Sequence, residues 1–254
     1  ALRIPKVEFK DMEFVYAGAK EPALKDISFC AMAGQTIGVI GGTGSGKSTL
    51  VNLIPRFYDA ASGQVLVDGT DVKEYSLDEL RDKTGVVPQK SVLFKGTLRD
   101  NMRWGKQDAS DEEIYRALDT AQAREFVDSK GEGLDLYIDQ GGHNLSGGQR
   151  QRLTIARALV RRPEILIMDD SASALDFATD ARLRKAIREN TGDMTVFIVS
   201  QRATTIKGAD TILVLDEGRL AGMGTHKELL KDCQVYREIC LSQLSKEEVE
   251  RDEQ

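Results

Sequence analysis

The chain has 254 residues and a net charge of −6; 41% of its residues are hydrophobic and 30% are charged. These values are typical of a globular protein with one large domain, or with a domain and a subdomain. The acidic balance argues against nonspecific nucleic-acid binding, which needs a broad basic surface. No stretch approaches the ~20 apolar residues of a membrane span, and three scattered cysteines argue against a disulfide framework.

The first 40 residues predict three strands. Residues 7–16 alternate polar and apolar side chains, as a half-exposed strand does, and residues 24–30 predict its antiparallel partner. Residues 36–40 form a short apolar run typical of a buried strand. Tyr16 ends the first strand. Its ring is suited to stack on an adenine face, although a tyrosine at a strand end more often packs against the core.

The segment after the third strand has the sequence of a phosphate-binding loop. Residues 41–48 match G-x-x-x-x-G-K-[ST] at every fixed position, and an apolar-periodic helix follows. Glycines let backbone N–H groups close around phosphate oxygens without Cβ clashes. Lys47 would reach the β- and γ-phosphates, and the Ser48 hydroxyl would bind Mg²⁺. The predicted nucleotide site comprises Gly41, Gly42, Thr43, Gly44, Ser45, Gly46, Lys47, Ser48 and Thr49.

The middle of the chain changes from strands to helices. Residues 64–67 predict a strand between two turn signals, residues 77–83 a short helix, and residues 84–87 a buried strand ended by a proline. Gln89 follows that proline. Helical patterns dominate over residues 97–162, which predicts a helical subdomain inserted into an α/β core.

A second glycine-rich helix start lies within this helical part. Ser146 is placed to cap a helix, and Gln149 is its reciprocal partner in a capping box. Gly147 and Gly148 leave the helix N-terminus bare, and a bare, capped N-terminus is another anion site. The ordinary interpretation, a glycine-rich helix start without a ligand, is disfavoured because two such termini in one chain indicate two phosphate contacts.

Buried strands return near residue 165. The apolar run 165–168 ends in Asp169 and Asp170, and the run 195–199 is followed by Ser200 and then Gln201. A carboxylate at the C-terminal end of a strand can hold Mg²⁺ or its water, so Asp169 is a candidate second element of the phosphate site. The remaining predicted elements are a crossover helix at 178–189, a strand at 211–215 and a C-terminal helix capped at Thr225.

Together these motifs resemble the nucleotide-binding domain of an ATP-binding cassette (ABC) transporter over nearly the whole chain. The resemblance implies an α/β P-loop NTPase core with an antiparallel β subdomain and an inserted α-helical subdomain. We expect the core at about 1–84 and 163–245, the helical subdomain at about 85–162, and a charged, disordered tail at 246–254. Because the chain begins with Ala1 rather than Met, we expect it to be part of a longer polypeptide.

The resemblance also implies roles for single residues. Residues 41–48 are Walker A, 145–149 the signature motif LSGGQ, and 165–169 Walker B. Tyr16 is then the aromatic A-loop residue that meets adenine. The metal ligands for Mg²⁺ are Ser48, Asp169 and the Q-loop glutamine, Gln89, which also senses the transmembrane domains. The remaining ATP contacts are Ser146, Gly147, Gly148, Gln149 and the D-loop residue Asp176.

The amino-acid sequence between the motifs resembles the exporter-type, multidrug branch of the family, for example in VPQKSVLFKGTLRDNM. In that branch six transmembrane helices precede the domain, which implies a place at the cytoplasmic face of the cell membrane. Two such domains dimerise head to tail, and each ATP lies between Walker A of one chain and LSGGQ of the other.

Three positions depart from the family pattern. Asp170 stands where exporters carry the Glu that serves as general base, and its carboxylate is one methylene, roughly 1.5 Å, further back. Gln201 replaces the switch histidine and cannot carry a proton near neutral pH. Gln140 replaces the X-loop Glu. We therefore predict slow hydrolysis at this chain's Walker site, while its intact LSGGQ completes the site of a non-identical partner, as in heterodimeric exporters with one degenerate site.

Three alternatives remain beside this prediction. The first is a purely regulatory ATP-binding module, and the second is a homodimeric exporter domain with slow hydrolysis. The third is a soluble cassette protein of translation or DNA repair. The last is disfavoured because such proteins usually carry two cassettes or a long coiled-coil insertion, and neither is present.

Overall fold

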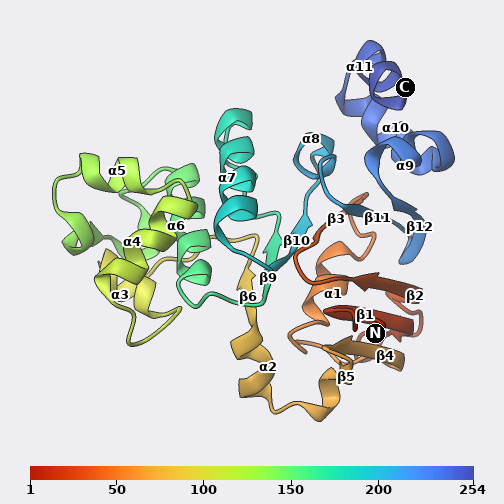
Figure 1. Cartoon of the computed structure of the whole chain (residues 1–254), viewed down its shortest axis with the longest axis horizontal. Coiled ribbons are helices and arrows are strands. Elements are labelled where there is room, and N and C mark those ends of the chain that lie inside the picture. The colour runs from red at the N-terminus through yellow and green to blue at the C-terminus, as the bar shows by residue number, and fades with distance from the viewer. The chain divides into compact units, whose positions relative to one another are not determined.

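The computed structural model describes residues 1–254, which form two compact units (Figure 1). The first unit contains Ala1–Thr84 and Asp193–Gln254, and the second contains Gly85–Gly192. None of the helices is both long and apolar enough to cross a lipid bilayer.

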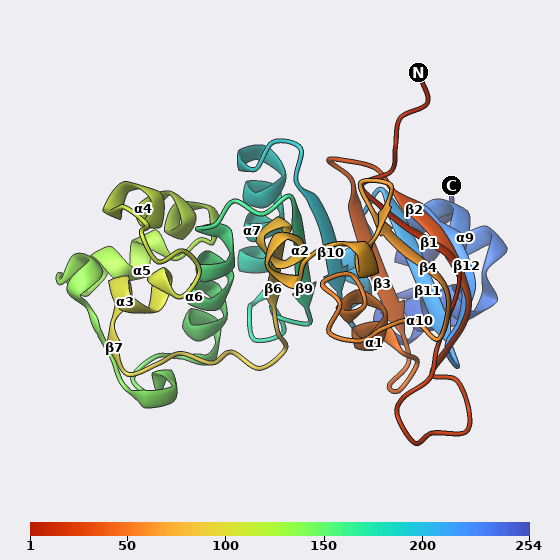
Figure 2. The ribbon, with the colours of Figure 1, turned by 90° about the horizontal axis from the view of Figure 1, so that it is seen from below.

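An antiparallel sheet forms one part of the first unit (Figure 2). Its strand order is β2-β1-β4-β5, and Phe9 of β1 lies opposite Phe29 of β2 with ring centroids 4.6 Å apart. The predicted pairing of residues 7–16 with residues 24–30 is confirmed. The strands are β1 (Val7–Phe14), β2 (Leu24–Ala31), β4 (Ser62–Val67) and β5 (Thr70–Asp71).

A parallel group of strands lies in the same unit. Strand β3 (Thr36–Gly41) pairs in parallel with both β10 (Thr195–Val199) and β11 (Thr211–Asp216). Strand β12 (Arg219–Gly224) runs antiparallel to β11. All five residues of β10 are buried, as expected for a strand covered on both faces. Helix α1 (Lys47–Asn52) follows β3, so the phosphate loop leaves the carboxyl end of the central strand.

Helices complete the first unit. Helix α11 begins with a capping box between Ser245 and Glu248, and Val249 on its inner face is fully buried. The expectation of a disordered tail at 246–254 is therefore wrong. These residues are highly charged, but they form a capped helix that buries one apolar side chain, Val249. The helices are α2 (Leu77–Lys83), α8 (Ala203–Ile206), α9 (His226–Asp232), α10 (Gln234–Gln243) and α11 (Lys246–Glu253), with the short 3-10 turn η1 (Val72–Glu74).

The second unit is mostly helical, as its yellow and green helices in Figure 1 show. Strand β6 (Thr84–Val87) neighbours β9 (Ile165–Asp169), and β7 (Gly96–Thr97) pairs with β8 (Tyr137–Ile138). The helices are α3 (Leu98–Arg103), α4 (Asp111–Thr120), α5 (Arg124–Ser129), α6 (Gly147–Leu159) and α7 (Phe177–Asn190), with the short 3-10 turns η2 (Gly133–Asp135) and η3 (Gln140–Gly142). The unit thus extends beyond residue 162, and the predicted domain boundaries stay a prediction.

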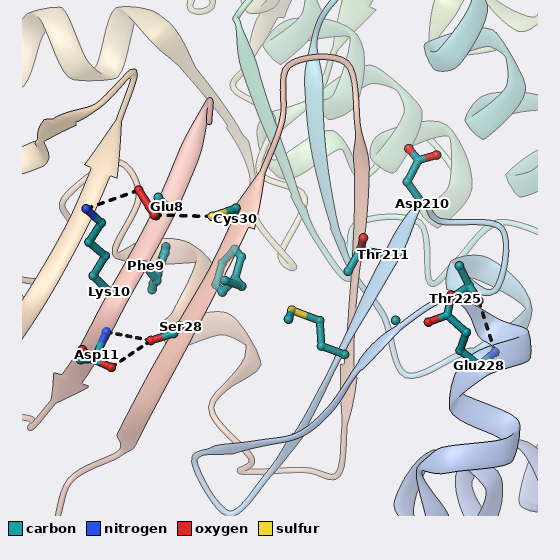
Figure 3. A pocket seen from close by; sticks show the side chains of 13 residues that line it. Glu8, Phe9, Lys10, Asp11, Ser28, Cys30, Asp210, Thr211, Thr225 and Glu228 are labelled. Atoms are coloured by element: carbon teal, nitrogen blue, oxygen red, sulfur yellow. Dashed lines mark hydrogen bonds and ion pairs between the residues drawn. The ribbon is translucent and has the colours of Figure 1, made fainter. Parts of the chain in front are cut away.

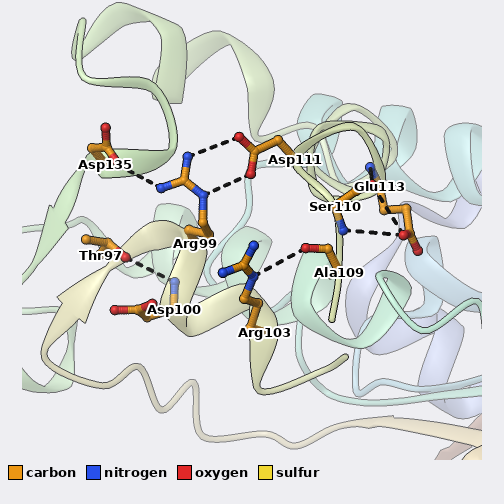
Figure 4. Close-up of polar contacts among 9 residues, drawn as sticks. All are labelled: Thr97, Arg99, Asp100, Arg103, Ala109, Ser110, Asp111, Glu113 and Asp135. Atoms are coloured by element: carbon orange, nitrogen blue, oxygen red, sulfur yellow. Dashed lines mark hydrogen bonds and ion pairs between the residues drawn. The ribbon is translucent and has the colours of Figure 1, made fainter. Parts of the chain in front are cut away.

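Arg99 connects three elements of this unit (Figure 4). From α3 its guanidinium donates to both carboxylate oxygens of Asp111, at 2.9 and 3.1 Å, and to Asp135 of η2 at 2.7 Å. These hydrogen bonds raise the pKa of Arg99 above its ordinary value. The arginine thereby fixes the start of α4 and the η2 turn against α3.

Candidate functional site

The phosphate loop has a backbone that only glycine adopts readily at two points. Gly44 has φ +77° and Gly46 has φ +102°, both in the left-handed region. A Cβ on Gly46 would stand 2.7 Å from Leu24 Cδ2, whereas a Cβ on Gly42 or Gly44 would meet nothing within 4 Å. The loop is thus packed against the unit at Gly46 and open at Gly42 and Gly44.

The polar groups of this loop fit a phosphate ligand. Lys47 Nζ donates to the carbonyls of Gly41 at 2.7 Å and Gly42 at 2.9 Å, which holds the ammonium over the loop. No side chain caps α1, so its first turn presents backbone N–H groups. The Ser45 hydroxyl is buried without a hydrogen-bond partner. A donor set of backbone N–H groups and one ammonium suits the oxygens of a triphosphate.

Tyr16 lies beside the helix that follows the loop. Its hydroxyl hydrogen bonds with Thr49 Oγ1, although the two residues are 33 positions apart. The ring makes edge contacts with Phe14 and Tyr58 at centroid distances of 4.7 and 5.5 Å, and it remains 40% exposed. Tyr16 thus packs against neighbouring rings and keeps part of its own surface open, and its contact with adenine stays a prediction.

Gln201 follows the strand next to β3. Because β10 and β3 are parallel, with Val199 opposite Val39, Gln201 and the phosphate loop leave the same edge of the sheet. The carbonyl of Gln201 accepts from Gln243 Nε2 at 2.6 Å, and Gln243 Oε1 accepts from Ala203 N at 2.7 Å. The last residue of helix α10 thus holds the loop that carries Gln201.

The two acidic candidates lie at the end of β9 in the second unit. Asp169 is the last residue of the strand and is buried. Asp170 has φ +50°, a left-handed conformation that aspartate tolerates better than most residues, and the chain turns sharply there. Gln89 follows β6, which neighbours β9, and both Gln89 and Gln140 are exposed.

The signature segment forms the predicted capping box. Ser146 Oγ accepts from Gln149 N at 3.1 Å, and Gln149 Oε1 accepts from Ser146 N at 3.0 Å, which confirms the prediction. A Cβ added to Gly147 or Gly148 would meet Ala174 atoms at 3.5 and 3.4 Å. The glycines therefore lie against the loop that leads to α7.

That loop ends at Asp176, the N-cap of α7. Its carboxylate accepts from Thr179 N at 2.7 Å, and this hydrogen bond lowers the pKa of Asp176 below its ordinary value. Sequence reasoning missed Gln151, whose side chain contacts the same loop at Ser173 and Ala174. The signal was a glutamine on the buried face of α6, where Thr154 is the other polar residue.

A cavity of about 670 Å³ lies in the first unit, away from every candidate residue (Figure 3). Strands β1 and β2 line one side with Asp11, Ser28 and Cys30, and β12 and the start of α9 line the other. Asp11 and Ser28 hydrogen bond to each other there. This cavity is distinct from the nucleotide motifs.

Comparison with known proteins identifies the family. The model of the ABC transporter family matches residues 24–173, which is more than half of the chain and runs from β2 through the signature and β9. The chain belongs to the ABC transporter family. It is an ABC transporter ATPase, and the predicted fold class, a mixed α/β ABC ATPase fold with antiparallel β and helical subdomains, is confirmed.

This ABC ATPase is similar to parts of longer proteins. It is 49% identical over 233 residues to an uncharacterized ABC transporter ATP-binding protein of Mycobacterium tuberculosis, covering 91% of this chain and 40% of that protein. It is 43% identical over 240 residues to an ATP-dependent lipid A-core flippase of Haemophilus influenzae, covering 94% of this chain and 41% of the flippase.

A solved structure agrees with these relatives. The structure of a bacterial Atm1-family ABC exporter with ATP bound matches 97% of this chain at a TM-score of 0.90 and 37% identity, and 43% of the exporter is covered. The chain thus spans about two fifths of the length of the proteins it matches.

Proposed function

We propose that this chain is the ATP-binding domain of an ABC exporter and works at the cytoplasmic face of the membrane. The support is its likeness to a flippase and to an Atm1-family exporter, each more than twice its length. The transmembrane part of such an exporter would contact the domain near Gln89. The transported compound is then moved by a cycle of ATP binding and hydrolysis.

The loop geometry supports a division of labour in ATP binding. Tyr16 faces the adenine, while the backbone N–H groups of residues 41–49 and Lys47 bind the phosphates. Ser48, Asp169 and Gln89 have the hydroxyl, carboxylate and amide oxygens that Mg²⁺ prefers. Mg²⁺ neutralises charge on the β- and γ-phosphate oxygens when it is bound.

The pair Asp170 and Gln201 carries the second half of the proposal, a slow Walker site. Each stands at the end of a buried strand, where the family has a glutamate and a histidine. A shortened carboxylate reaches less far toward an attacking water, and an amide neither takes nor gives a proton. General-base catalysis contributes about 10²- to 10⁴-fold, so this site holds Mg-ATP and hydrolyses it slowly.

The signature segment, unlike the Walker site, matches the family motif in full. Its capping box is complete and its two glycines present a bare helix N-terminus, which attracts anions. We infer that this signature segment completes the ATP site of a second, non-identical half-transporter, which supplies its own glutamate and histidine. The pair is then a head-to-tail heterodimer with one degenerate and one hydrolysing site.

Restoring the two missing groups tests this proposal. Asp170→Glu with Gln201→His is expected to raise ATP turnover at this chain's site by about 10²-fold or more, with Mg-ATP affinity within about twofold of wild type. The single substitutions are the matched controls, and each should recover only part of the gain. Equal turnover of wild type and double variant with the same partner would show that the site is not degenerate.

The same two residues also favour a regulatory module that binds ATP without hydrolysing it. A single-turnover assay separates the two functions when the partner's Walker A lysine is substituted and Lys47 is kept. Slow release of phosphate supports a weak ATPase, whereas complete retention of ATP supports the regulatory module. Turnover by the chain without another partner would favour the homodimeric exporter instead.

A further inference from the structure

We propose that Gln151 is a positioning residue that joins the signature turn to the loop before α7, so that both reach the partner's ATP site as one rigid corner. This inference rests on the proposed head-to-tail function. We call residues 146–148 together with residues 173–176 the signature corner.

The side chain of Gln151 links the two parts of this corner directly. Its Nε2 donates to Ser173 Oγ at 3.0 Å, and its Oε1 accepts from Ala174 N at 2.8 Å. Gln151 is only 6% exposed, so both ends of its amide are used inside the protein. A buried amide that hydrogen bonds at both ends keeps a defined orientation, because any other placement leaves a polar group unpaired.

The loop itself is exposed where Gln151 holds it. Ser173 and Ala174 are exposed, while Leu175 is buried and Asp176 is fixed as the N-cap of α7. Gln151 thus holds the two exposed residues between the end of β9 and this cap.

The same loop touches the signature glycines. A Cβ on Gly148 would stand 3.4 Å from both Ala174 O and Leu175 Cδ2, which is ordinary van der Waals contact. A shift of Ala174 would therefore change what lies beside the helix N-terminus of α6. Gln151 lies one turn into that helix, and it sets the distance between the bare N-terminus and the loop.

The chain offers a matched set of variants for a test. Gln151→Leu keeps most of the side-chain volume and removes both hydrogen bonds. Ser173→Ala removes one of them from the exposed side and leaves the core intact. Thr154→Val is the control, because Thr154 lies on the same buried face of α6 and its hydroxyl donates only to Arg150 O in its own helix, at 2.6 Å.

Hydrogen exchange on the nucleotide-free chain measures the positioning itself. We expect amides 172–176 to exchange about 10-fold faster in Gln151→Leu, less so in Ser173→Ala, and as in wild type in Thr154→Val. Unchanged exchange in Gln151→Leu would overturn the inference. Thermal unfolding of each variant shows whether a change is local to the loop.

ATP turnover measures the consequence for the partner site, in pairs of this chain with the non-identical half-transporter whose own Walker site hydrolyses ATP. Gln151→Leu is expected to lower kcat by about 10-fold with KM for ATP within about twofold, since it disturbs the corner and not the phosphate loop. If Gln151→Leu loosens the loop but leaves kcat unchanged, while Ser146→Ala still lowers kcat, the proposed coupling is overturned. If Ser146→Ala also leaves kcat unchanged, the head-to-tail function itself fails.

Discussion

Gly46 ends the phosphate loop in a conformation that other residues adopt at a cost. Gly46→Ala is expected to destabilise the chain by about 2 kcal/mol or more, because φ is +102° and the new Cβ would clash with Leu24. Gly18→Ala is the matched control, since Gly18 has φ +79° with open space around it, and should cost only about 1 kcal/mol. Urea unfolding measures both. Equal losses would show that Leu24 does not constrain the loop.

Asp170 and Gln201 are the two residues at which we propose that the chemistry of the Walker site is altered. Each follows a strand whose residues are all buried. What changes is reach at Asp170 and proton transfer at Gln201. Under our proposal such a site keeps the geometry for binding ATP and lacks the group that drives hydrolysis.

At the scale of elements, Asp68 ties together three segments of the first unit. It lies in the turn between β4 and β5, and its carboxylate accepts from Lys6, before β1, at 2.9 Å and from Lys83, at the end of α2, at 3.0 Å. Burial alone would raise the pKa of Asp68, but the two ammonium groups outweigh it and the pKa ends below its ordinary value. The ionised form therefore stabilises the fold.

The sign of the pH dependence follows from this lowered pKa. The stabilisation is complete above the unfolded-state pKa of about 3.9 and is lost as the pH falls through the lower folded-state value. Asp68→Asn is expected to cost about 1 kcal/mol at pH 7, since the pair is partly exposed, and the difference from wild type should vanish near pH 2. Urea unfolding at both pH values measures it. The exposed Asp232→Asn is the control, and a difference that persists at low pH would contradict the explanation.

The elements also show where sequence patterns sufficed. The phosphate loop, the capping box at Ser146 and the buried strands are local features, so their residues predicted them. Helix α11 also begins with a capping-box signal, S-x-x-E from Ser245 to Glu248, but its run of charged residues suggested disorder. Only the folded chain shows that Val249 is buried and that Asp252 bonds with His226 at 3.1 Å.

Contacts between distant segments were beyond the sequence. Gln151 and Ala174 are 23 positions apart, and Gln243 and Gln201 are 42 apart, so no local spacing indicates that they meet. The motifs indicate the residues that we propose to bind the nucleotide, whereas only the folded structure shows which residues hold those motifs in place. The sequence thus indicated the motif residues of the candidate site, but not Gln151 and Gln243, which hold the loops of those motifs.

At the scale of the whole molecule, our proposal gives this ABC ATPase two anion-binding helix starts that serve different sites. In this proposal the phosphate loop binds the chain's own nucleotide, and the signature corner contacts the nucleotide of the partner. Asp170 and Gln201 are proposed to weaken the first site, while the signature motif LSGGQ is kept. The central claim is therefore an asymmetric pair in which this chain holds ATP as a clamp while hydrolysis proceeds on the partner.

The fate of the γ-phosphate on each chain tests this claim most directly. The transporter is turned over with photoreactive azido-ATP labelled on either the α- or the γ-phosphate, trapped with vanadate, cross-linked by light and separated into its two chains. The account predicts that this chain keeps both labels, while the partner keeps the α-label and loses the γ-label. Loss of the γ-label from this chain as fast as from the partner would contradict it.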